Sequence, residues 1–243
     1  MKRLATLLFF LSSMIVKAQT CVSNSSSLNF NPPPITGTQH VTFTTDIGLV
    51  VTDSITVEAW INASQWAATA AQGTIFCKHS WANGEQGYVL RAGGNGVVSF
   101  TLAGDSMGLP TSWKDLTSAT PYMATNTWYH VAGTFDGVTI KVYINGMLRG
   151  SLPFQGAIIP GAAFPAKIGM LSDQTNAVST GGRYWMGKID EVRVWHRALT
   201  SAELIANMNH HLDTSIQQDR LAGYWRLNEN IGTLTHEDRK SVV

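Results

Sequence analysis

Apolar and polar residues alternate along this chain in short segments, which are separated by turns rich in Gly, Pro, Asn and Asp. This pattern is typical of a sandwich or barrel of short strands. It predicts strands at Val41–Thr44, Ile55–Ile61, Thr74–Lys78, Gly87–Arg91, Val97–Leu102, Thr127–Phe135, Thr139–Ile144, Ala166–Met170 and Lys188–Trp195. The dipeptides Asp136-Gly137 and Asn145-Gly146 favour tight hairpin turns on both sides of one strand. A helix is predicted over Thr200–Asn209, because Thr200 and Glu203 have the spacing of a capping box.

The segment Gly187–Leu204, GKIDEVRVWHRALTSAEL, carries the most information about the site. Strict strand alternation places Glu191 and Arg193 on one face together with Ile189, and Asp190 on the other face with the valines that follow it. That phase predicts an interior position for Asp190. Because a buried carboxylate requires a cation or several hydrogen-bond donors, Asp190 is a candidate site residue.

This segment, together with TWYHVAGTFDG (127–137) and KVYINGMLRG (141–150), resembles the laminin-G-like group of concanavalin A-like lectin/glucanase domains. The resemblance covers roughly Leu28 to Glu229. It implies an all-β, concanavalin A-like jelly-roll sandwich of two antiparallel sheets, with a binding role more often than a catalytic one. LAGYWRLNE (221–229) is similar to a segment that, in tandem members of the group, opens the next domain or closes the present one.

The N-terminal residues predict a signal peptide over 1–18. A basic start, Met1-Lys2-Arg3, precedes the apolar run Leu4–Val16, which is too short to span a membrane. We therefore expect a secreted protein, extracellular or at the cell surface. The predicted organisation is a flexible segment over 19–27, the sandwich over 28–229, and a polar tail over 230–243 that ends a truncated product or a fragment of a longer chain.

Composition argues against nucleic acid and anionic membranes as partners, and the two cysteines allow a disulfide without requiring one. Charged residues make up 14% of the 243 residues and the net charge is +1. Because no cluster of Lys and Arg is present, neither nucleic acid nor an anionic membrane is expected as a partner. Cys21 and Cys77 are predicted to pair in an oxidising compartment. The alternative is that Cys77, in an apolar strand, is a small buried residue.

Catalysis is not expected. Glucanases of this superfold carry a Glu-x-Asp-x-x-Glu strand, whose outer carboxylates lie on one face about 5 Å apart in retaining enzymes. This spacing does not occur in the sequence. Glu58 is alone on its strand, and Asp190 and Glu191 are adjacent residues that alternation points to opposite faces. A degenerate hydrolase therefore ranks last among the functions considered.

Calcium is the metal that the resemblance implies. Related jelly rolls hold one structural Ca²⁺ with the aspartate of an (I/V)-D-x-V-R-V strand and with backbone oxygens of earlier loops, and Asp190 occupies that position. Ca²⁺ takes six to eight oxygen ligands, many of which can be carbonyls. In the alternative, Asp190 accepts hydrogen bonds from backbone amides or pairs with an arginine.

Sugar binding is the leading functional hypothesis, because eight tryptophans are many for this length and sugar rings stack on exposed aromatic faces. The candidate ligand-binding residues are Trp66, Trp81, Trp113, Tyr122 and Arg91. The sequence thus predicts a non-catalytic module that binds an extracellular glycan. The alternative is a protein-adhesion or spacer module, in which these aromatic residues pack within loops.

Overall fold

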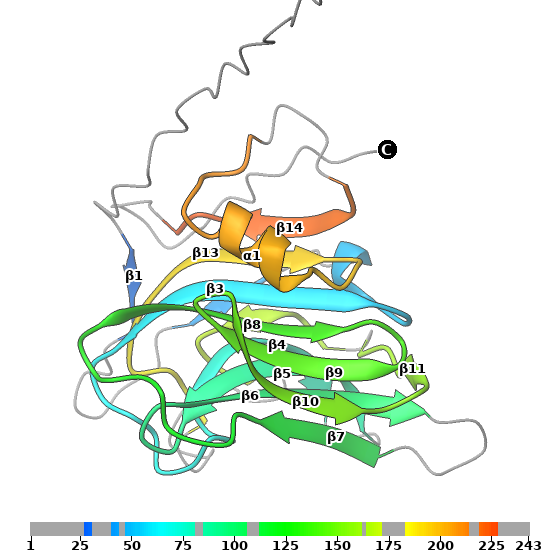
Figure 1. Cartoon of the computed structure of the whole chain (residues 1–243), viewed down its shortest axis with the longest axis horizontal. Coiled ribbons are helices and arrows are strands. Elements are labelled where there is room, and N and C mark those ends of the chain that lie inside the picture. Colours follow the sequence, from blue (N-terminus) through cyan, green and yellow to red (C-terminus); the bar gives the residue numbers. More distant parts are fainter. Residues whose placement is uncertain are drawn as a thin grey trace, which may run out of the picture.

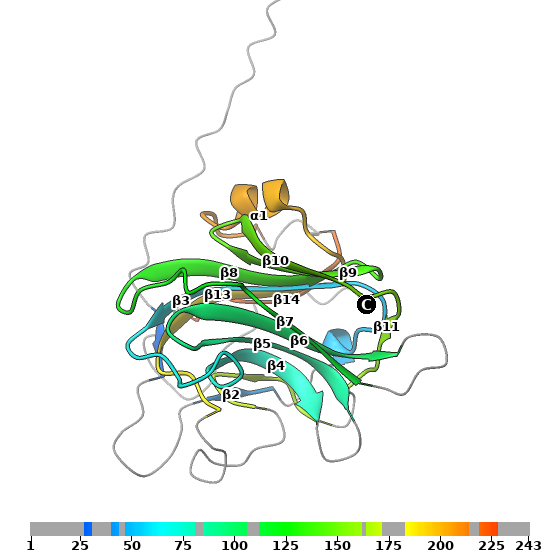
Figure 2. The same ribbon diagram turned by 60° about the horizontal axis from the view of Figure 1, so that its bottom comes forward.

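The computed structural model describes residues 27–30, 40–43, 47–80, 85–105, 112–161, 164–171, 183–213 and 219–227. They form two seven-stranded antiparallel sheets packed face to face (Figures 1 and 2). Sheet A has the order β1 (Leu28–Asn29), β13 (Gly187–Trp195), β3 (Ile55–Ala63), β8 (Trp128–Phe135), β9 (Thr139–Ile144) and β10 (Met147–Pro153), with β14 (Leu221–Trp225) also paired to β13. Sheet B has the order β11 (Ala157–Ile158), β6 (Val97–Asp105), β5 (Gln86–Gly93), β4 (Thr74–Ser80), β12 (Lys167–Ile168) and β2 (Val41–Thr42), with β7 (Ser112–Thr117) also paired to β6. The predicted all-β jelly-roll sandwich is confirmed.

The core lies between the inner faces of the two sheets. On β3 the residues Ile55, Val57, Ala59 and Ile61 point inward, and they meet Val98, Phe100 and Leu102 of β6 within the same buried cluster. The sheets approach closely at Gly133 of β8, where an added Cβ would lie 2.2 Å from the Phe100 ring. A side chain larger than hydrogen therefore does not fit there without movement of the opposite sheet.

Every strand predicted from the pattern is present, and the hairpin after Ile144 has the expected geometry, with positive φ at Asn145 (50°) and Gly146 (72°). Five of the described strands were not predicted: the two-residue β1 and β11, and the longer β7, β10 and β14. Breaker residues explain β7 and β10. β7 follows the glycine- and proline-containing stretch Met107–Thr111, and β10 includes Gly150 and an irregular register after Leu148. These breaker residues hid the strand signal in both cases.

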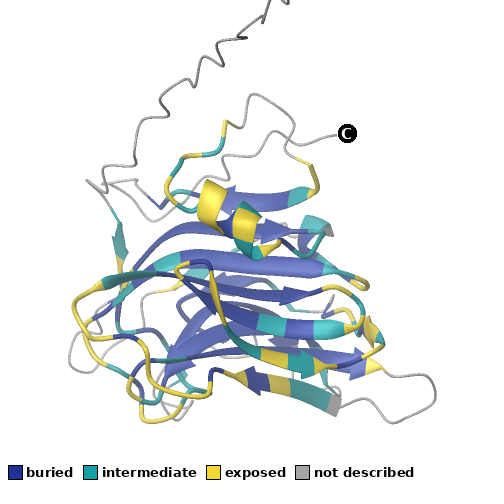
Figure 3. Ribbon diagram, in the orientation of Figure 1, coloured by how far each residue is buried: buried dark blue, intermediate teal, exposed yellow. Residues whose placement is uncertain are grey.

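A short helix, α1 (Ser201–Asn207), covers part of the outer face of sheet A (Figure 1). The predicted capping box is confirmed: Thr200 accepts from the Glu203 amide, and the Glu203 side chain accepts from the Thr200 amide. Beneath the helix, Trp195 and Leu204 belong to a second, smaller apolar cluster. The strands under α1 are therefore buried on both faces (Figure 3). The other helical element within the described residues is a 3-10 turn, η1 (Ile47–Leu49).

A β-bulge in β13 makes the predicted alternation wrong. Asp190 lies opposite Trp60 and Arg193 lies opposite Glu58, so β13 has one residue more than β3 between these pairs. The extra residue is accommodated at Glu191, whose φ is +51°.

The bulge reverses the predicted phase of the residues before it. Ile189 joins Val192 and Val194 in the core instead of facing away from them. Asp190, opposite Trp60, lies on the outer face of sheet A, although it is buried there with 3% exposure. Asp190 is therefore buried as predicted, but not in the interior of the sandwich.

Candidate functional site

The antiparallel register of sheet B aligns side chains on its outer face in rows that cross the strands. One row contains Thr74, Arg91, Ser99 and Thr117. The next contains Lys167, Cys77, Val89, Thr101 and Asp115. These residues alternate with the core residues Leu90, Phe100 and Leu116, which fixes their outward direction. Among the described residues, α1 lies on the outer face of sheet A and no α-helix lies on that of sheet B (Figure 2).

Arg91 is the centre of a polar cluster on this face. Its Nη2 donates to the Thr101 hydroxyl and to Asp115 Oδ1 (3.0 Å), and its Nη1 donates to the Ala71 carbonyl (3.1 Å). The Thr101 hydroxyl also contacts Asp115. The Arg91 side chain is 2% exposed, whereas that of Asp115 is 56% exposed. A buried guanidinium thus holds a carboxylate that remains open to solvent.

Burial lowers the pKa of Arg91, and the charge of Arg183 lowers it further, while Asp115 opposes both effects. Arg91 stays protonated at neutral pH because its ordinary pKa is far above 7. Burial is the main cause of the lowered pKa, and Asp115 is the group that compensates for it.

An aromatic pair lies beside the polar cluster. The rings of His79 and Trp113 meet edge to face, with their centroids 5.7 Å apart. His79 is buried, and Trp113 is half-buried on β7 opposite Ala103. Burial, Arg91 and Arg183 lower the pKa of His79 to about 3, so its imidazole is neutral at physiological pH. The face therefore combines an indole with hydroxyl, carboxylate and guanidinium groups, a combination that suits the C–H and O–H surfaces of a sugar.

The structure brings together two of the five predicted ligand residues, Arg91 and Trp113. Trp66 instead packs edge to face on Trp185 (6.2 Å), which is buried in the core. Tyr122 is 39% exposed, with the Arg149 guanidinium 4.2 Å from its ring centroid, so its contacts are with β10. Trp81 lies outside the described residues.

Sequence reasoning missed His79, Thr101 and Asp115. A signal was available for the last: in SWKDLT (112–117), Trp113 and Asp115 alternate with the apolar Leu116, as in a half-buried strand. The loop interpretation of Trp113 concealed it. His79 and Thr101 gave no signal of their own, since the pairing of β4, β5, β6 and β7 is what gathers them.

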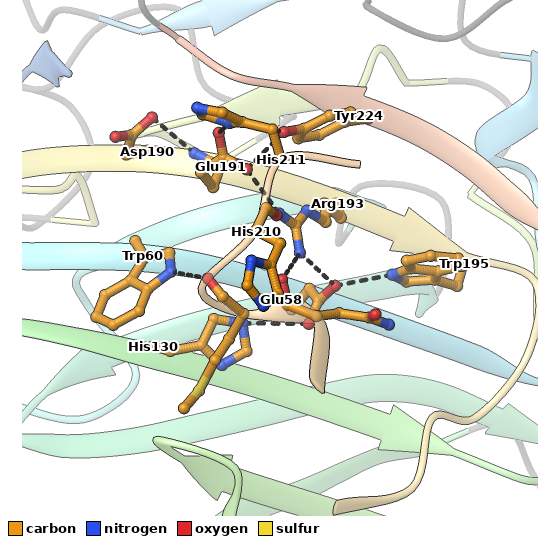
Figure 4. A network of polar contacts seen from close by, with 12 residues as sticks. Glu58, Trp60, His130, Asp190, Glu191, Arg193, Trp195, His210, His211 and Tyr224 are labelled. Atoms are coloured by element: carbon orange, nitrogen blue, oxygen red, sulfur yellow. Dashed lines mark hydrogen bonds and ion pairs between the residues drawn. The ribbon is translucent and has the colours of Figure 1, made fainter. Parts of the chain in front are cut away.

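A second polar cluster lies on the outer face of sheet A, beneath α1 (Figure 4). Glu58 accepts from Trp195 Nε1 (2.9 Å), and its carboxylate lies 3.1 Å from His130 Nε2 and 3.7 Å from Arg193 Nη1. Complete burial alone would raise the pKa of Glu58, but His130, Arg193 and Trp195 together lower it below its ordinary value. Glu58 is therefore ionised and paired inside the protein.

Arg193 extends this cluster toward the helix and β14. Its Nη2 contacts Glu191 Oε2 at 2.6 Å and donates to the His210 carbonyl at 2.6 Å, while Nη1 donates to the Asn207 carbonyl at 3.0 Å. The Tyr224 hydroxyl donates to Glu191 (2.6 Å), and His211 Nδ1 lies 2.7 Å from the other Glu191 oxygen. Burial would lower the pKa of Arg193, but the two glutamates raise it.

This second cluster stabilises the fold. Both carboxylates, Glu58 and Glu191, are almost completely buried and contact the same guanidinium. Hydrolysis of a glycosidic bond requires two carboxyl groups that reach the substrate, and these two do not. Their partners come from β3, β8, β13, β14 and the segment after α1. The cluster therefore links α1 and the residues that follow it to sheet A.

Neither the calcium nor the disulfide prediction is tested by the structure. Asp190 Oδ1 accepts from the Glu191 amide (2.9 Å), which fits the alternative of backbone hydrogen bonding. Within the described residues, no three His, Cys, Asp or Glu side chains group as metal ligands, although calcium can also take carbonyl oxygens. Cys77 is buried and its thiol donates to the Met170 carbonyl (3.1 Å), while Cys21 lies outside the described residues.

Comparison with known proteins defines the class. Residues 36–205 match the family described as the concanavalin A-like lectin/glucanases superfamily. The chain belongs to this family, and its sandwich of two antiparallel sheets agrees with the laminin-G-like resemblance. No curated protein sequence matches the chain.

Two solved structures are similar in fold. A proposed carbohydrate-binding protein from Bacteroides ovatus matches with a TM-score of 0.61 and 23% identity, over 82% of this chain and 52% of that one. A heptameric SAP-like pentraxin from Limulus polyphemus matches with a TM-score of 0.51 and 20% identity, over 75% of this chain and 82% of that one. The chain thus spans about half the length of the Bacteroides protein. In the described part of the chain, no helix has the length and apolar character needed to cross a membrane.

Proposed function

We propose that this domain is a secreted, non-catalytic carbohydrate-binding module whose ligand lies across the outer face of sheet B. The observation that carries the proposal is the juxtaposition of the half-buried Trp113 indole with the solvent-exposed Asp115 carboxylate, which Arg91 and Thr101 hold in place. Sugar sites combine an apolar ring platform with a few fixed polar groups in this way.

Two further observations support the proposal. The family includes lectins by its description, and one protein of similar fold is itself a proposed carbohydrate-binding protein. Because fold alone is a weak guide to ligand, these similarities add less weight than the site does. Secretion is supported by the basic and apolar N-terminus, residues 1–18.

Glycan binding by purified residues 19–243 tests the proposal, with an immobilised panel followed by titration calorimetry. Trp113→Ala should weaken binding roughly five- to thirtyfold, because an aromatic platform contributes about 1–2 kcal/mol. Tyr122→Ala is the matched control, since it removes an exposed aromatic side chain near β10. Absence of binding to the whole panel, or unchanged binding in Trp113→Ala, would contradict the proposal.

One feature favours the alternative of a protein-adhesion module. Met147 and Leu148 at the start of β10 are more than half exposed, and Ile205 of α1 is 49% exposed. Ile205 packs on the neighbouring Gly146, so these side chains gather where α1 meets the β9–β10 hairpin. Binding to an array of extracellular proteins that is lost in Ile205→Asp but kept in Trp113→Ala would favour this function.

A further inference from the structure

The two charged groups that pair in the polar cluster of sheet B differ in their access to solvent. The side chain of Asp115 is 56% exposed, whereas that of Arg91 is 2% exposed. Thr101, the third member of the cluster, is 1% exposed. A ligand on this face therefore meets the carboxylate of Asp115, and the guanidinium of Arg91 lies behind it.

The two oxygens of this carboxylate have different surroundings. Asp115 Oδ1 accepts from Arg91 Nη2 (3.0 Å) and from the Thr101 hydroxyl. No residue that the structure describes donates a hydrogen bond to Oδ2. Because an ionised carboxylate has about four acceptor sites and no donor, Oδ2 can accept about two further hydrogen bonds. The contacts at Oδ1 fix the carboxylate, so Oδ2 is held in one place at the surface.

The strand β7 places this oxygen beside the indole of the site. Trp113 and Asp115 are two residues apart on β7, so they share one face of the sheet with their Cα atoms about 7 Å apart. Lys114 points to the other side of the strand, where its Nζ lies 5.3 Å from the centroid of the Phe154 ring. Lys167 is in the same row as Asp115 but four strands away, which is about 19 Å. The charged group nearest to the indole face is therefore the acceptor.

We infer that this site selects uncharged sugars, whose hydroxyl groups donate to Asp115 Oδ2 while the sugar ring stacks on Trp113. This inference rests on the proposed function and names its class of ligand. Asp115 is the residue that determines specificity, because a hydroxyl group supplies the proton that its free oxygen needs.

An acidic substituent is disfavoured at this position for two reasons. A carboxylate or sulfate group has acceptors only, so it leaves Oδ2 without a donor. Its negative charge also repels that of Asp115. The cation that would offset this repulsion, Arg91, already bonds to Asp115 and is covered. Binding of an uncharged sugar should also be nearly independent of salt, because the ligand carries no charge for salt to screen.

Three pairs of polymers that differ mainly in charge provide the test. Dextran is compared with dextran sulfate, the methyl ester of polygalacturonate with polygalacturonate, and hydroxyethylcellulose with carboxymethylcellulose. We expect the full mature chain to bind at least one neutral member about tenfold more tightly than its acidic partner. Its affinity should change less than about twofold as salt rises from about 0.05 to 0.5 M. Glycans that bind in the immobilised panel should likewise be uncharged.

Asp115→Asn connects the preference to this site. The variant keeps the oxygen that accepts from Arg91 and Thr101 but places an amide donor where Oδ2 was. Affinity for the preferred neutral polymer should fall about five- to tenfold, because a hydrogen bond to a charged acceptor is lost. Affinity for its acidic partner should rise as the repulsion is removed, so that the two values come within about threefold of each other.

Asp136→Asn is the matched control. It removes a carboxylate that pairs with Lys141 (3.1 Å) at the turn between β8 and β9 of sheet A, so both affinities should stay unchanged. Titration calorimetry measures affinity separately from the number of folded molecules, so partial unfolding of a variant does not imitate the expected result. The comparison of wild-type affinities needs no variant.

The outcomes separate this inference from the proposed function. Tighter binding of the acidic members, or binding that weakens as salt rises, overturns the inference and leaves the proposed function standing. An unchanged ratio of the two affinities in Asp115→Asn also overturns it, since the selectivity would then come from another group. If no glycan of any charge binds, both the inference and the proposed function are wrong.

Discussion

Replacing Arg193 by methionine removes the side chain that contacts both Glu58 and Glu191 beneath α1. The variant keeps an unbranched apolar stem of similar length, so loss of packing is small, and the main effect is that two buried carboxylates lose their cation. Breaking a buried pair in this way costs about 3–5 kcal/mol. The carbonyls of Asn207 and His210 also lose a donor, but they are only partly buried, so water can replace it at little cost.

For a domain of this size, a loss of 3–5 kcal/mol corresponds to a fall in Tm of roughly 6–20 °C. Urea unfolding followed by tryptophan fluorescence measures the loss, and a thermal scan measures the fall. Arg197→Met is the matched control. Arg197 contacts Glu203 and Asp219 near the surface, with a side chain that is 26% exposed, so its loss should cost less than about 1 kcal/mol.

The pH dependence of the Arg193→Met effect gives a second check. Because the pKa of Glu58 is lowered in the folded protein, its pairing stabilises the fold above the ordinary value of 4.5 and loses that contribution as the pH falls. The difference between wild type and Arg193→Met should therefore shrink below pH 4.5. A loss equal to that of Arg197→Met, or a difference that grows in acid, would refute the assignment of the cluster as a paired, stabilising network.

Two further outcomes follow from the structure, and a third tests the calcium site that the sequence predicts. His79 is neutral in the folded protein and protonated below about pH 6.5 when unfolded, so unfolding free energy should fall by about 2 kcal/mol between pH 6.5 and 5, and His79→Gln should flatten that slope. Gly133→Ala should destabilise by about 1–3 kcal/mol in urea unfolding, because its methyl group would overlap Phe100, and an unchanged midpoint would show that the sheets adjust freely. If calcium is bound at Asp190, chelation should lower the Tm of wild type but not of Asp190→Ala; equal Tm values with and without chelator would exclude a stabilising metal.

The fold was largely predictable because its signals are local. Alternation over 5 to 9 residues and the Asn145-Gly146 dipeptide determine strands and turns without knowledge of the partner strands. Thr200 and Glu203 likewise determine where α1 begins, since the capping box needs only its own four residues. The resemblance to laminin-G-like domains then supplied the stacking of the sheets, which no local pattern contains.

The candidate site was less predictable because it depends on pairing between distant strands. Arg91 and Asp115 are 24 residues apart and meet only through the register of β5, β6 and β7. The bulge at Glu191 was also hidden, since a residue with positive φ other than glycine leaves no mark in an alternating sequence. Asp190 was therefore assigned to the wrong face, although its burial was anticipated.

The two outer faces of the sandwich differ in the exposure of the carboxylates that pair with a buried arginine. This difference supports the proposed placement of the ligand on sheet B. On sheet A, Arg193 meets Glu58 and Glu191 beneath a helix, so its charge is matched and covered. On sheet B, Arg91 is equally buried, yet its carboxylate partner Asp115 is open to solvent. A buried charge that only stabilises the fold is expected to pair with an opposite charge that is buried as well, because desolvation without full pairing costs free energy. Asp115 is paired with Arg91 and still exposed, so the proposed ligand can reach the charged pair on sheet B, whereas the carboxylates on sheet A are covered.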